Sequence, residues 1–255
     1  MNGSIASHVA RRIGRLWRVR PGHVAWPGGV VSFTFDDFPK SALSAGGAIL
    51  EKYRTRGTYY VALGLAGSDG NQGPIADLAE ILSAHQRGHE LACHSYSHLD
   101  CSRASAAAIA DDLRRNGAAF AALIDGFGPR NFAYPYGRYL LPAKRLVAPR
   151  YDSCRGTSGG SNHGTVDFAD LRGTSIYAPQ YDEGALRRLI DRNRTVGGWL
   201  IFYTHDVGET PSPYGCTPRQ LEAIVDYAAR CGAVLPVGDV LASLSGGRPN
   251  GAPVH

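Results

Sequence analysis

Two histidines are the residues of this sequence best suited to bind a metal ion together. His94 and His98 lie four positions apart. On a helical turn this spacing places both imidazoles on one face, about 5–6 Å apart at Cβ. Two imidazoles and one carboxylate leave open positions at a divalent ion, which is a catalytic arrangement. Residue 95 is serine, so the HExxH motif of zincin proteases is absent. Taken alone, two histidines at this spacing are more often surface or capping residues.

Two adjacent carboxylates could complete such a site. Asp36 and Asp37 follow the apolar run from Val30 to Phe35. Neighbouring carboxylates repel each other unless a cation or a proton lies between them. A metal bound by one of them removes this problem, and the other could then act as a base on a metal-bound water, whose pKa falls to about 7 on zinc. The alternative is that Asp37 caps the next helix, which is the commoner role for an isolated pair.

Strands that alternate with helices must position these residues. The pattern predicts strands at 30–35, 58–63, 91–93, 131–134, 199–203 and 233–235, and helices at 42–53, 75–86, 109–124, 186–194 and 221–229. This alternation indicates a mainly parallel sheet, and six or more such units favour a barrel-like closure. Active residues gather at the carboxyl ends of the strands in such folds. Asp36, Asp37, the His94–His98 segment, the 135–137 turn and His205 all follow predicted strands.

The charge distribution separates the N-terminus from the rest of the chain. The 255 residues carry a formal net charge of +5. No acidic residue precedes Asp36, whereas five arginines do: Arg11, Arg12, Arg15, Arg18 and Arg20. The remainder is nearly neutral, so a nucleic-acid partner is not indicated.

We therefore expect three segments: a basic amphipathic segment at 1–25, a catalytic domain at 26–245 and a flexible tail at 246–255. In the first segment the apolar residues fall at helical spacing: Ile5, Val9, Ile13, Leu16 and Trp17. Such a helix could lie on an anionic membrane surface or pack against the main domain.

Cysteines and apolar runs exclude several protein classes. The five cysteines are odd in number and form no CxxC pair, so neither a disulfide framework nor a zinc knuckle is indicated. The sequence contains no run of eighteen apolar residues, so it does not predict a transmembrane helix. The N-terminus shows no apolar signal-peptide core, which favours a cytoplasmic protein, in one interpretation at the inner face of the membrane. The glycine-rich segments lack nucleotide-binding motifs.

Four short motifs in order resemble those of the NodB-homology polysaccharide deacetylases, carbohydrate esterase family four. They are Thr34-Phe35-Asp36-Asp37, His94-Ser95-xx-His98, Phe132-Ala133-Tyr134-Pro135-Tyr136-Gly137 and Tyr203-Thr204-His205. The similarity spans about residues 30–240. It implies a distorted (β/α) barrel with seven or eight mostly parallel strands.

The resemblance also implies a role for each matching residue. Asp37, His94 and His98 would hold a divalent metal, most often Zn²⁺, with Co²⁺, Ni²⁺ or Mn²⁺ as alternatives. Asp36 would be the base that activates the metal-bound water, and His205 the acid that protonates the leaving group. The backbone N–H of Tyr136 would stabilise the oxyanion. We expect Tyr203, Pro135 and Arg155 to contact the substrate.

The sequence departs from the family pattern at three points. The arginine that commonly orients the base is replaced by Ala133, and Arg138 or Arg155 could supply a guanidinium instead. No Asp-x-x-Asp-Trp motif is found, so the residue that orients His205 is not identified. Asp206 is adjacent in the sequence, but adjacency alone does not make it that residue. Tyr203 stands where many members have leucine, which leaves the acyl group open.

The resemblance implies a metal-dependent hydrolase that removes N-acetyl groups, or as a second choice O-acetyl groups, from a sugar polymer, an oligomer or a lipid-linked saccharide. An acetylated saccharide is then the expected partner, and residues 1–25 could add a peripheral membrane contact. Two alternatives remain at this point. One is an amidohydrolase of the deformylase or imidase type acting on a small metabolite, and the other is a non-catalytic carbohydrate-binding domain.

Overall fold

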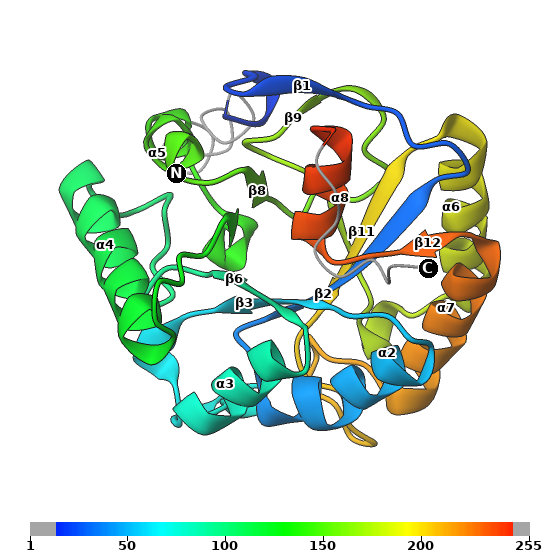
Figure 1. Ribbon diagram of the computed structural model, residues 1–255, viewed down its shortest axis with the longest axis horizontal. Coiled ribbons are helices and arrows are strands. Elements are labelled where there is room, and N and C mark those ends of the chain that lie inside the picture. The colour runs from blue at the N-terminus through cyan, green and yellow to red at the C-terminus, as the bar shows by residue number, and fades with distance from the viewer. Residues whose placement is uncertain (1–13, 247–255) are drawn as a thin grey trace, which may run out of the picture.

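A parallel sheet that curls into a nearly closed barrel organises the described part of the chain, residues 14–246 of a computed structural model (Figure 1). The strand order is β10-β11-β2-β3-β6-β7-β8, and β12 pairs with β2 beside this path. The strands are β2 (Val30–Asp36), β3 (Thr58–Val61), β6 (Glu90–Cys93), β7 (Asn131–Ala133), β8 (Ser153–Arg155), β10 (Gly173–Ser175), β11 (Trp199–Thr204) and β12 (Ala233–Val234). All pairs within this sheet are parallel. The expected distorted barrel is therefore confirmed.

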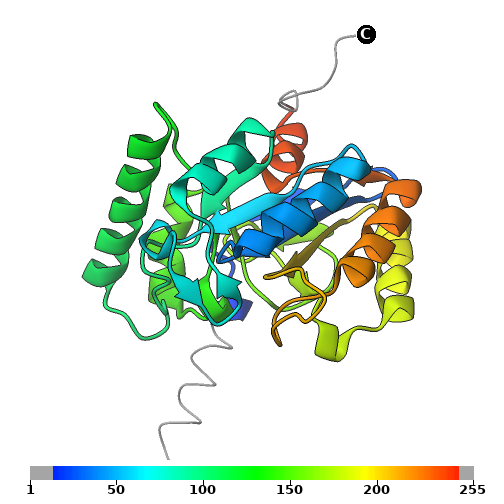
Figure 2. The same ribbon diagram turned by 90° about the horizontal axis from the view of Figure 1, so that it is seen from below.

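Helices surround the sheet, and α5, α4, α3, α2, α7 and α6 follow one another around it in Figure 1. Figure 2 shows the same arrangement of helices edge-on, from below. The α-helices are α2 (Ala48–Lys52), α3 (Leu78–Gln86), α4 (Ala106–Leu123), α5 (Leu141–Val147), α6 (Glu183–Val196), α7 (Pro218–Cys231) and α8 (Val237–Leu244). The shorter helical segments are η1 (Ala42–Gly47), η2 (Leu63–Leu65), η3 (Pro135–Gly137), η4 (Ala148–Arg150) and η5 (Ala178–Gln180). The helices that were expected from periodicity are present with shifted ends.

Two of these shifts have clear local causes. The helix expected from residue 75 begins at Leu78, because Asp77 and Glu80 form a capping box at its start. The helix expected over 42–53 is a π-helix in its first part. Gly46 lies so close to the sheet that a Cβ there would be 2.8 Å from the ring of Phe35. Close packing on the sheet therefore accompanies the irregular turn.

The strand register brings the polar strand ends to one edge of the barrel. Residues 199–204 of β11 lie opposite residues 30–35 of β2, so His205 emerges next to Asp36. Cys93 of β6 is paired with Val61 of β3, and Ala133 of β7 with Arg155 of β8. All residues of β2 and β11 are buried, as expected for central parallel strands.

The segment before β10 joins the two edges of the sheet. Leu171 forms a parallel bridge with Arg155 of β8, and its N–H donates to the carbonyl of Cys154 at 2.8 Å. The chain then enters β10 at Gly173. The last strand and the first strand in the sheet order are thus connected through a few residues, which we call the seam.

Helix α8 covers the amino-terminal end of the strands. Its first N–H groups, on Val237 and Gly238, donate to Thr58 Oγ1 and Glu90 Oε2, at the starts of β3 and β6. Val237 and Val240 pack with Trp199 in one apolar cluster. With this end covered, the carboxyl ends of the strands form the open end of the barrel.

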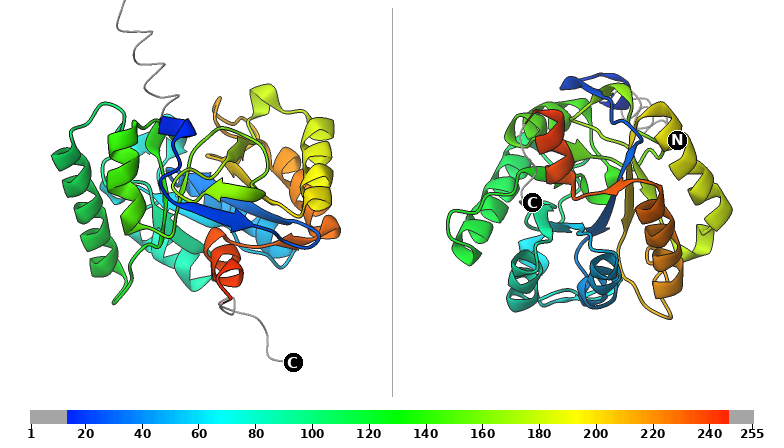
Figure 3. Two further views of the ribbon diagram at one scale, coloured as in Figure 1. Left: turned by 90° about the horizontal axis from the view of Figure 1, so that it is seen from above. Right: turned by 45° about the vertical axis from the view of Figure 1, so that its right-hand side comes forward.

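The N-terminal segment reaches the body of the protein through a short strand. β1 (Pro21–Val24) pairs antiparallel with β9 (Gly164–Asp167), as Figure 3 shows, and a second two-stranded sheet joins β4 (Asp69–Gly70) to β5 (Gly73–Pro74). Residues 1–13 and 247–255 lie outside the described residues, and with them most of the predicted basic helix and of the predicted tail. Between residues 14 and 246 no helix combines the length and the apolar character needed to cross a bilayer.

Candidate active site

Three side chains from two strand ends come together as a group that could hold a metal ion. Asp37 follows β2, and His94 and His98 follow β6. One ligand atom from each lies within 4.8 Å of the others. Asp37 Oδ1 is 3.1 Å from His98 Nε2 and 3.5 Å from His94 Nε2. The structure therefore brings together the three residues expected as metal ligands.

The donor set fits a divalent cation. Asp37 Oδ1 is buried and has no hydrogen-bond partner among the described residues. Burial lowers the pKa of His94 to about 3, and burial also lowers the pKa of His98. Both imidazoles are then neutral at pH 7, which is the form that binds metal. An unpaired carboxylate oxygen beside two neutral imidazoles is the combination that a zinc-like ion satisfies.

The segment that carries the two histidines is an irregular loop and not a helical turn, which corrects the expected geometry. Ser95 and His98 both have positive φ, 60° and 55°. Asp112 of α4 shapes the loop, because its carboxylate accepts from the N–H groups of Tyr96 and Ser97 at 2.6 and 3.2 Å and from Ser97 Oγ at 2.7 Å. The imidazoles converge through this loop instead of through helical periodicity.

The ring of His94 is oriented by the neighbouring strand. Its Nδ1–H donates to the carbonyl of Ala133 at 2.8 Å, so Nε2 faces Asp37. A hydrogen bond of this kind fixes the tautomer of a metal-binding imidazole. Ala133 thus contributes its backbone carbonyl to the orientation of this imidazole.

The guanidinium next to Asp36 comes from another strand. Arg155 Nη2 lies 2.5 Å from each carboxylate oxygen of Asp36. The side chain of Arg155 is 1% exposed, and its guanidinium lies over the rings of Tyr203 and Tyr60, at 4.6 and 5.0 Å from their centroids. Arg138, the other candidate, lies 3.7 Å from Asp100 instead.

Burial and charge act in opposite directions on Asp36. Burial would raise the pKa of its carboxyl group, but the positive charge of Arg155 and the hydrogen bond from its guanidinium lower it below the ordinary value. For Asp37, burial raises the pKa to about 6. The two neighbouring carboxyl groups therefore differ in pKa, because only Asp36 has a guanidinium hydrogen-bonded to it.

His205 completes the site from the end of β11. Its Nε2 is 3.8 Å from Asp37 Oδ2, and its Nδ1–H donates to the carbonyl of Tyr214 at 3.1 Å. Asp206 does not take the place of a carboxylate partner, because its oxygens accept from Ser212 N and Ser212 Oγ. His205 is thus oriented by a main-chain carbonyl.

The turn after β7 places an exposed ring beside the candidate metal-binding group. Tyr136 has φ +58° inside η3, between the buried residues Pro135 and Gly137, and its ring centroid is 4.4 Å from that of His98. Of the six non-glycine described residues with positive φ, five lie in the loops of this site: Asp37, Phe38, Ser95, His98 and Tyr136. Such backbone strain is concentrated at functional sites in proteins.

Aromatic residues that sequence reasoning did not assign to the site also surround His205. The Tyr177 ring lies 5.9 Å from the His205 ring and 5.6 Å from that of Tyr203. Tyr214 is half exposed and lies 5.9 Å from His205. Tyr177 follows β10 without any motif around it, so only the folded arrangement reveals its place.

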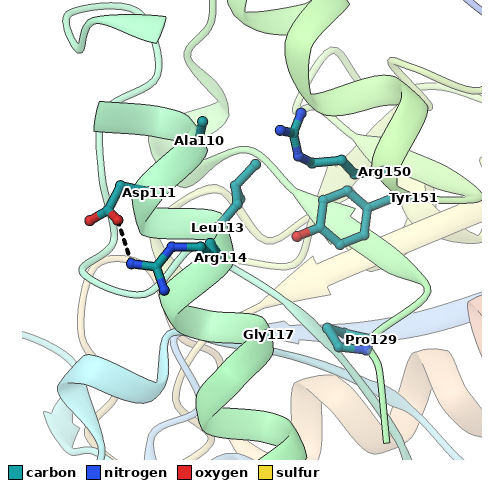
Figure 4. A pocket seen from close by; sticks show the side chains of 8 residues that line it. All are labelled: Ala110, Asp111, Leu113, Arg114, Gly117, Pro129, Arg150 and Tyr151. Atoms are coloured by element: carbon teal, nitrogen blue, oxygen red, sulfur yellow. Dashed lines mark hydrogen bonds and ion pairs between the residues drawn. The ribbon is translucent and has the colours of Figure 1, made fainter. Parts of the chain in front are cut away.

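A cavity of about 630 Å³ lies elsewhere, on the outside of the barrel (Figure 4). Figure 4 shows Arg150 and Tyr151 facing α4, which carries Leu113 and the ion pair between Asp111 and Arg114. None of the candidate site residues lines it. We therefore keep the strand-end group as the candidate site.

Comparison with known proteins finds similarity to polysaccharide deacetylases. The family model described as polysaccharide deacetylase matches residues 23–148. A chitin deacetylase from Arthroderma benhamiae is 31% identical over 121 residues, which are 47% of this chain and 31% of that protein. The chain thus matches less than a third of the length of that relative.

Two solved structures share the fold. A family 4 acetyl xylan esterase from Clostridium thermocellum, in complex with a cobalt ion, aligns over 86% of this chain and 92% of its own, with a TM-score of 0.57 and 21% identity. A chitin deacetylase from Colletotrichum lindemuthianum aligns over 91% of this chain and 95% of its own, with a TM-score of 0.55 and 17% identity.

Proposed function

Because this chain contains a polysaccharide deacetylase domain of the NodB-homology family, we propose that it is a metal-dependent hydrolase that removes N-acetyl groups from a saccharide. One observation carries the proposal. A carboxylate whose pKa is lowered and an oriented imidazole lie against the same three residues that could bind a metal. Hydrolysis of an amide needs a base, an acid and a site for the oxyanion, and a protein that only binds sugar needs none of them.

Asp37, His94 and His98 would hold the cation. When bound, a divalent ion supplies a Lewis acid and lowers the pKa of a neighbouring water molecule. Asp36, kept ionised by Arg155, accepts the proton of the water that attacks the acetyl carbon. The new C–O bond displaces the carbonyl electrons onto oxygen, where the N–H of Tyr136 would donate a hydrogen bond.

The second half of the reaction requires a proton donor. Collapse of the tetrahedral intermediate breaks the C–N bond, and an amine leaves only after its nitrogen is protonated. His205 Nε2 is the donor, because the hydrogen bond from Nδ1 to Tyr214 leaves Nε2 facing the site. The products are acetate and a free amino sugar. His205 is then neutral and Asp36 protonated, and exchange of protons with water restores both.

Paired substitutions of the neighbouring carboxylates test this proposal. Asp36→Asn should lower kcat for acetate release from N-acetylglucosamine oligomers by about 10²–10⁴-fold while the bound metal content stays unchanged. Asp37→Ala should lose both activity and metal. Asp111→Asn, on the exposed face of α4, is the matched control and should change neither. Thermal melting of each variant checks that it is folded.

The same assay separates the alternatives. Formamides and cyclic imides hydrolysed in place of N-acetyl oligomers would indicate a small-metabolite amidohydrolase. Binding of oligomers without any acetate release would indicate a carbohydrate-binding domain. The membrane contact of residues 1–25 and a cytoplasmic location stay predictions from the sequence.

A further inference from the structure

The carbonyl of Tyr214 holds His205 through two hydrogen bonds. It accepts from the ring Nδ1–H at 3.1 Å and from the main-chain N–H of the same residue at 3.2 Å. A carbonyl can only accept, so this contact places a proton on Nδ1 and directs Nε2 towards Asp37. The orientation of the His205 ring therefore depends on where the 206–216 loop places the carbonyl of Tyr214.

Asp206 fixes that loop from within. Its two carboxylate oxygens accept from the N–H of Ser212 at 2.7 Å and from Ser212 Oγ at 2.6 Å. Ser212 Oγ in turn accepts from the N–H of Tyr214 at 3.2 Å. The carbonyl of Asp206 accepts from the N–H of Cys216 at 3.0 Å, which closes the loop.

The packing around this carboxylate is tight. Asp206 is 7% exposed, and a Cβ at Gly215 would lie 2.4 Å from its Oδ1. Gly215 directly follows Tyr214, so the carboxylate lies against the residue whose carbonyl holds the histidine. A buried carboxylate whose two oxygens both accept hydrogen bonds from one loop keeps that loop in one conformation.

We propose that Asp206 and Ser212 are positioning residues for the general acid, acting on His205 through the main chain at Tyr214. The proposal rests on the proposed function, because it needs His205 to protonate the leaving group. The carboxylate of Asp206 accepts hydrogen bonds from Ser212 and does not contact His205 itself. It therefore orients the imidazole indirectly, through the loop that carries Tyr214. The His205 ring is thus held by a main-chain carbonyl, and not by a carboxylate bonded to its Nδ1.

This role has a specific chemical signature. An amine must be protonated before it leaves, whereas p-nitrophenolate leaves without a proton. Displacement of His205 should therefore slow the hydrolysis of N-acetyl oligomers and leave the hydrolysis of p-nitrophenyl acetate nearly unchanged. A general loss of structure would slow both reactions by the same factor.

The experiment compares Asp206→Ala and Ser212→Ala with the wild-type protein in its metal-loaded form. We expect kcat for an N-acetylglucosamine tetramer to fall by about tenfold or more, because displacing a catalytic group by 1 Å can cost about 10²-fold. KM, metal content and kcat for p-nitrophenyl acetate should change by less than about twofold. Ser212→Ala removes only one oxygen atom, so it serves as the test if Asp206→Ala does not fold.

A matched control exists on the other loop of the site. Asp112 binds the N–H groups of Tyr96 and Ser97 much as Asp206 binds Ser212, but it shapes the loop of the metal-binding histidines. Asp112→Ala should lower metal content and slow both substrates equally. A parallel change of amide and ester rates in the Asp206 and Ser212 variants, or no change in either, would overturn the proposal. A wild-type protein that cleaves the ester but no N-acetyl oligomer would instead remove the proposed function, and this inference with it.

Discussion

At the scale of single residues, the site depends on two adjacent carboxylates in different surroundings. Arg155 binds Asp36 and lowers its pKa against the effect of burial, whereas burial raises the pKa of Asp37 to about 6. Residues whose environments drive their pKa values apart commonly divide catalytic roles. Asp36 is thus suited to be a base, and Asp37 is suited to a metal that replaces its proton.

We therefore expect the arginine to set the pH range of the proposed activity. A base must be ionised, so the rate falls as the pH drops through the pKa of Asp36. Arg155→Gln removes the positive charge, the pKa of the buried carboxyl rises, and the acid limb of kcat/KM should move to higher pH by about 1–3 units. A pH–rate profile measures this shift. In Arg138→Gln the limb should stay in place, and an unmoved limb in Arg155→Gln would show that Asp36 does not depend on this guanidinium.

Sequence motifs identified Asp36, Asp37, His94, His98 and His205 before any coordinates, and the structure brings them together. They could not select between Arg138 and Arg155, because Arg155 lies 119 positions from Asp36 in the sequence. No sequence motif indicated the contacts of Tyr177 either. Contacts between distant strands leave no local pattern, so only the folded chain reveals them.

At the scale of elements, a buried lysine of α5 ties the N-terminal segment to the barrel. Lys144 Nζ donates to the carbonyls of Gly14 and Trp17, each at 3.0 Å, and lies 2.7 Å from Asp167 Oδ2. Asp167 also accepts from the N–H groups of Val19 and Arg20, just before β1. The pairing of β1 with β9 is therefore reinforced by one ion pair.

Removing this lysine should destabilise the protein. Lys144→Met leaves the Asp167 carboxylate buried without its cation and should lower the free energy of unfolding by about 3 kcal/mol. Urea denaturation provides the measurement. Arg114→Ala breaks the exposed pair with Asp111 and should cost less than about 1 kcal/mol. Equal losses in the two variants would mean that the buried pair contributes no more than a surface one.

Hydrophobic periodicity predicted the central strands and the long helices, because β2, β11, α4 and α7 are long enough to show a pattern. It missed β8 and β10, which have three residues each, and α8. The helical placement of His94 and His98 was wrong, because Asp112 and two positive φ angles shape a loop there. Interactions with other elements override local preference at such points.

At the scale of the whole molecule, a metal ion would connect separate parts of the sheet. Asp37 follows β2, whereas His94 and His98 follow β6, and β3 lies between these strands. Any ligand that binds only the folded state stabilises it by mass action. The fold and the metal site are therefore expected to be thermodynamically linked.

Zinc should raise the melting temperature. At a free concentration of about 100 times its Kd, a ligand adds about 2.7 kcal/mol to the stability of the folded state. Differential scanning fluorimetry of the chelator-treated protein, with and without Zn²⁺, measures the shift. Asp37→Ala should show almost none of it. A zinc-induced shift of the same size in both proteins would place the binding site elsewhere.

The ion pair between Asp36 and Arg155 depends on the seam of the barrel staying closed. Arg155 belongs to the edge strand β8 and pairs with the residues that lead into β10, whereas Asp36 belongs to a strand inside the sheet. If the edge strands detach, Asp36 loses its counter-charge while β2 and β6 still hold the proposed metal ligands. The molecule would then pass through a partly open form that keeps most of its secondary structure and the three proposed metal ligands, but in which no guanidinium positions the carboxylate of Asp36. Catalytic competence would thus be gained last during folding and lost first during denaturation.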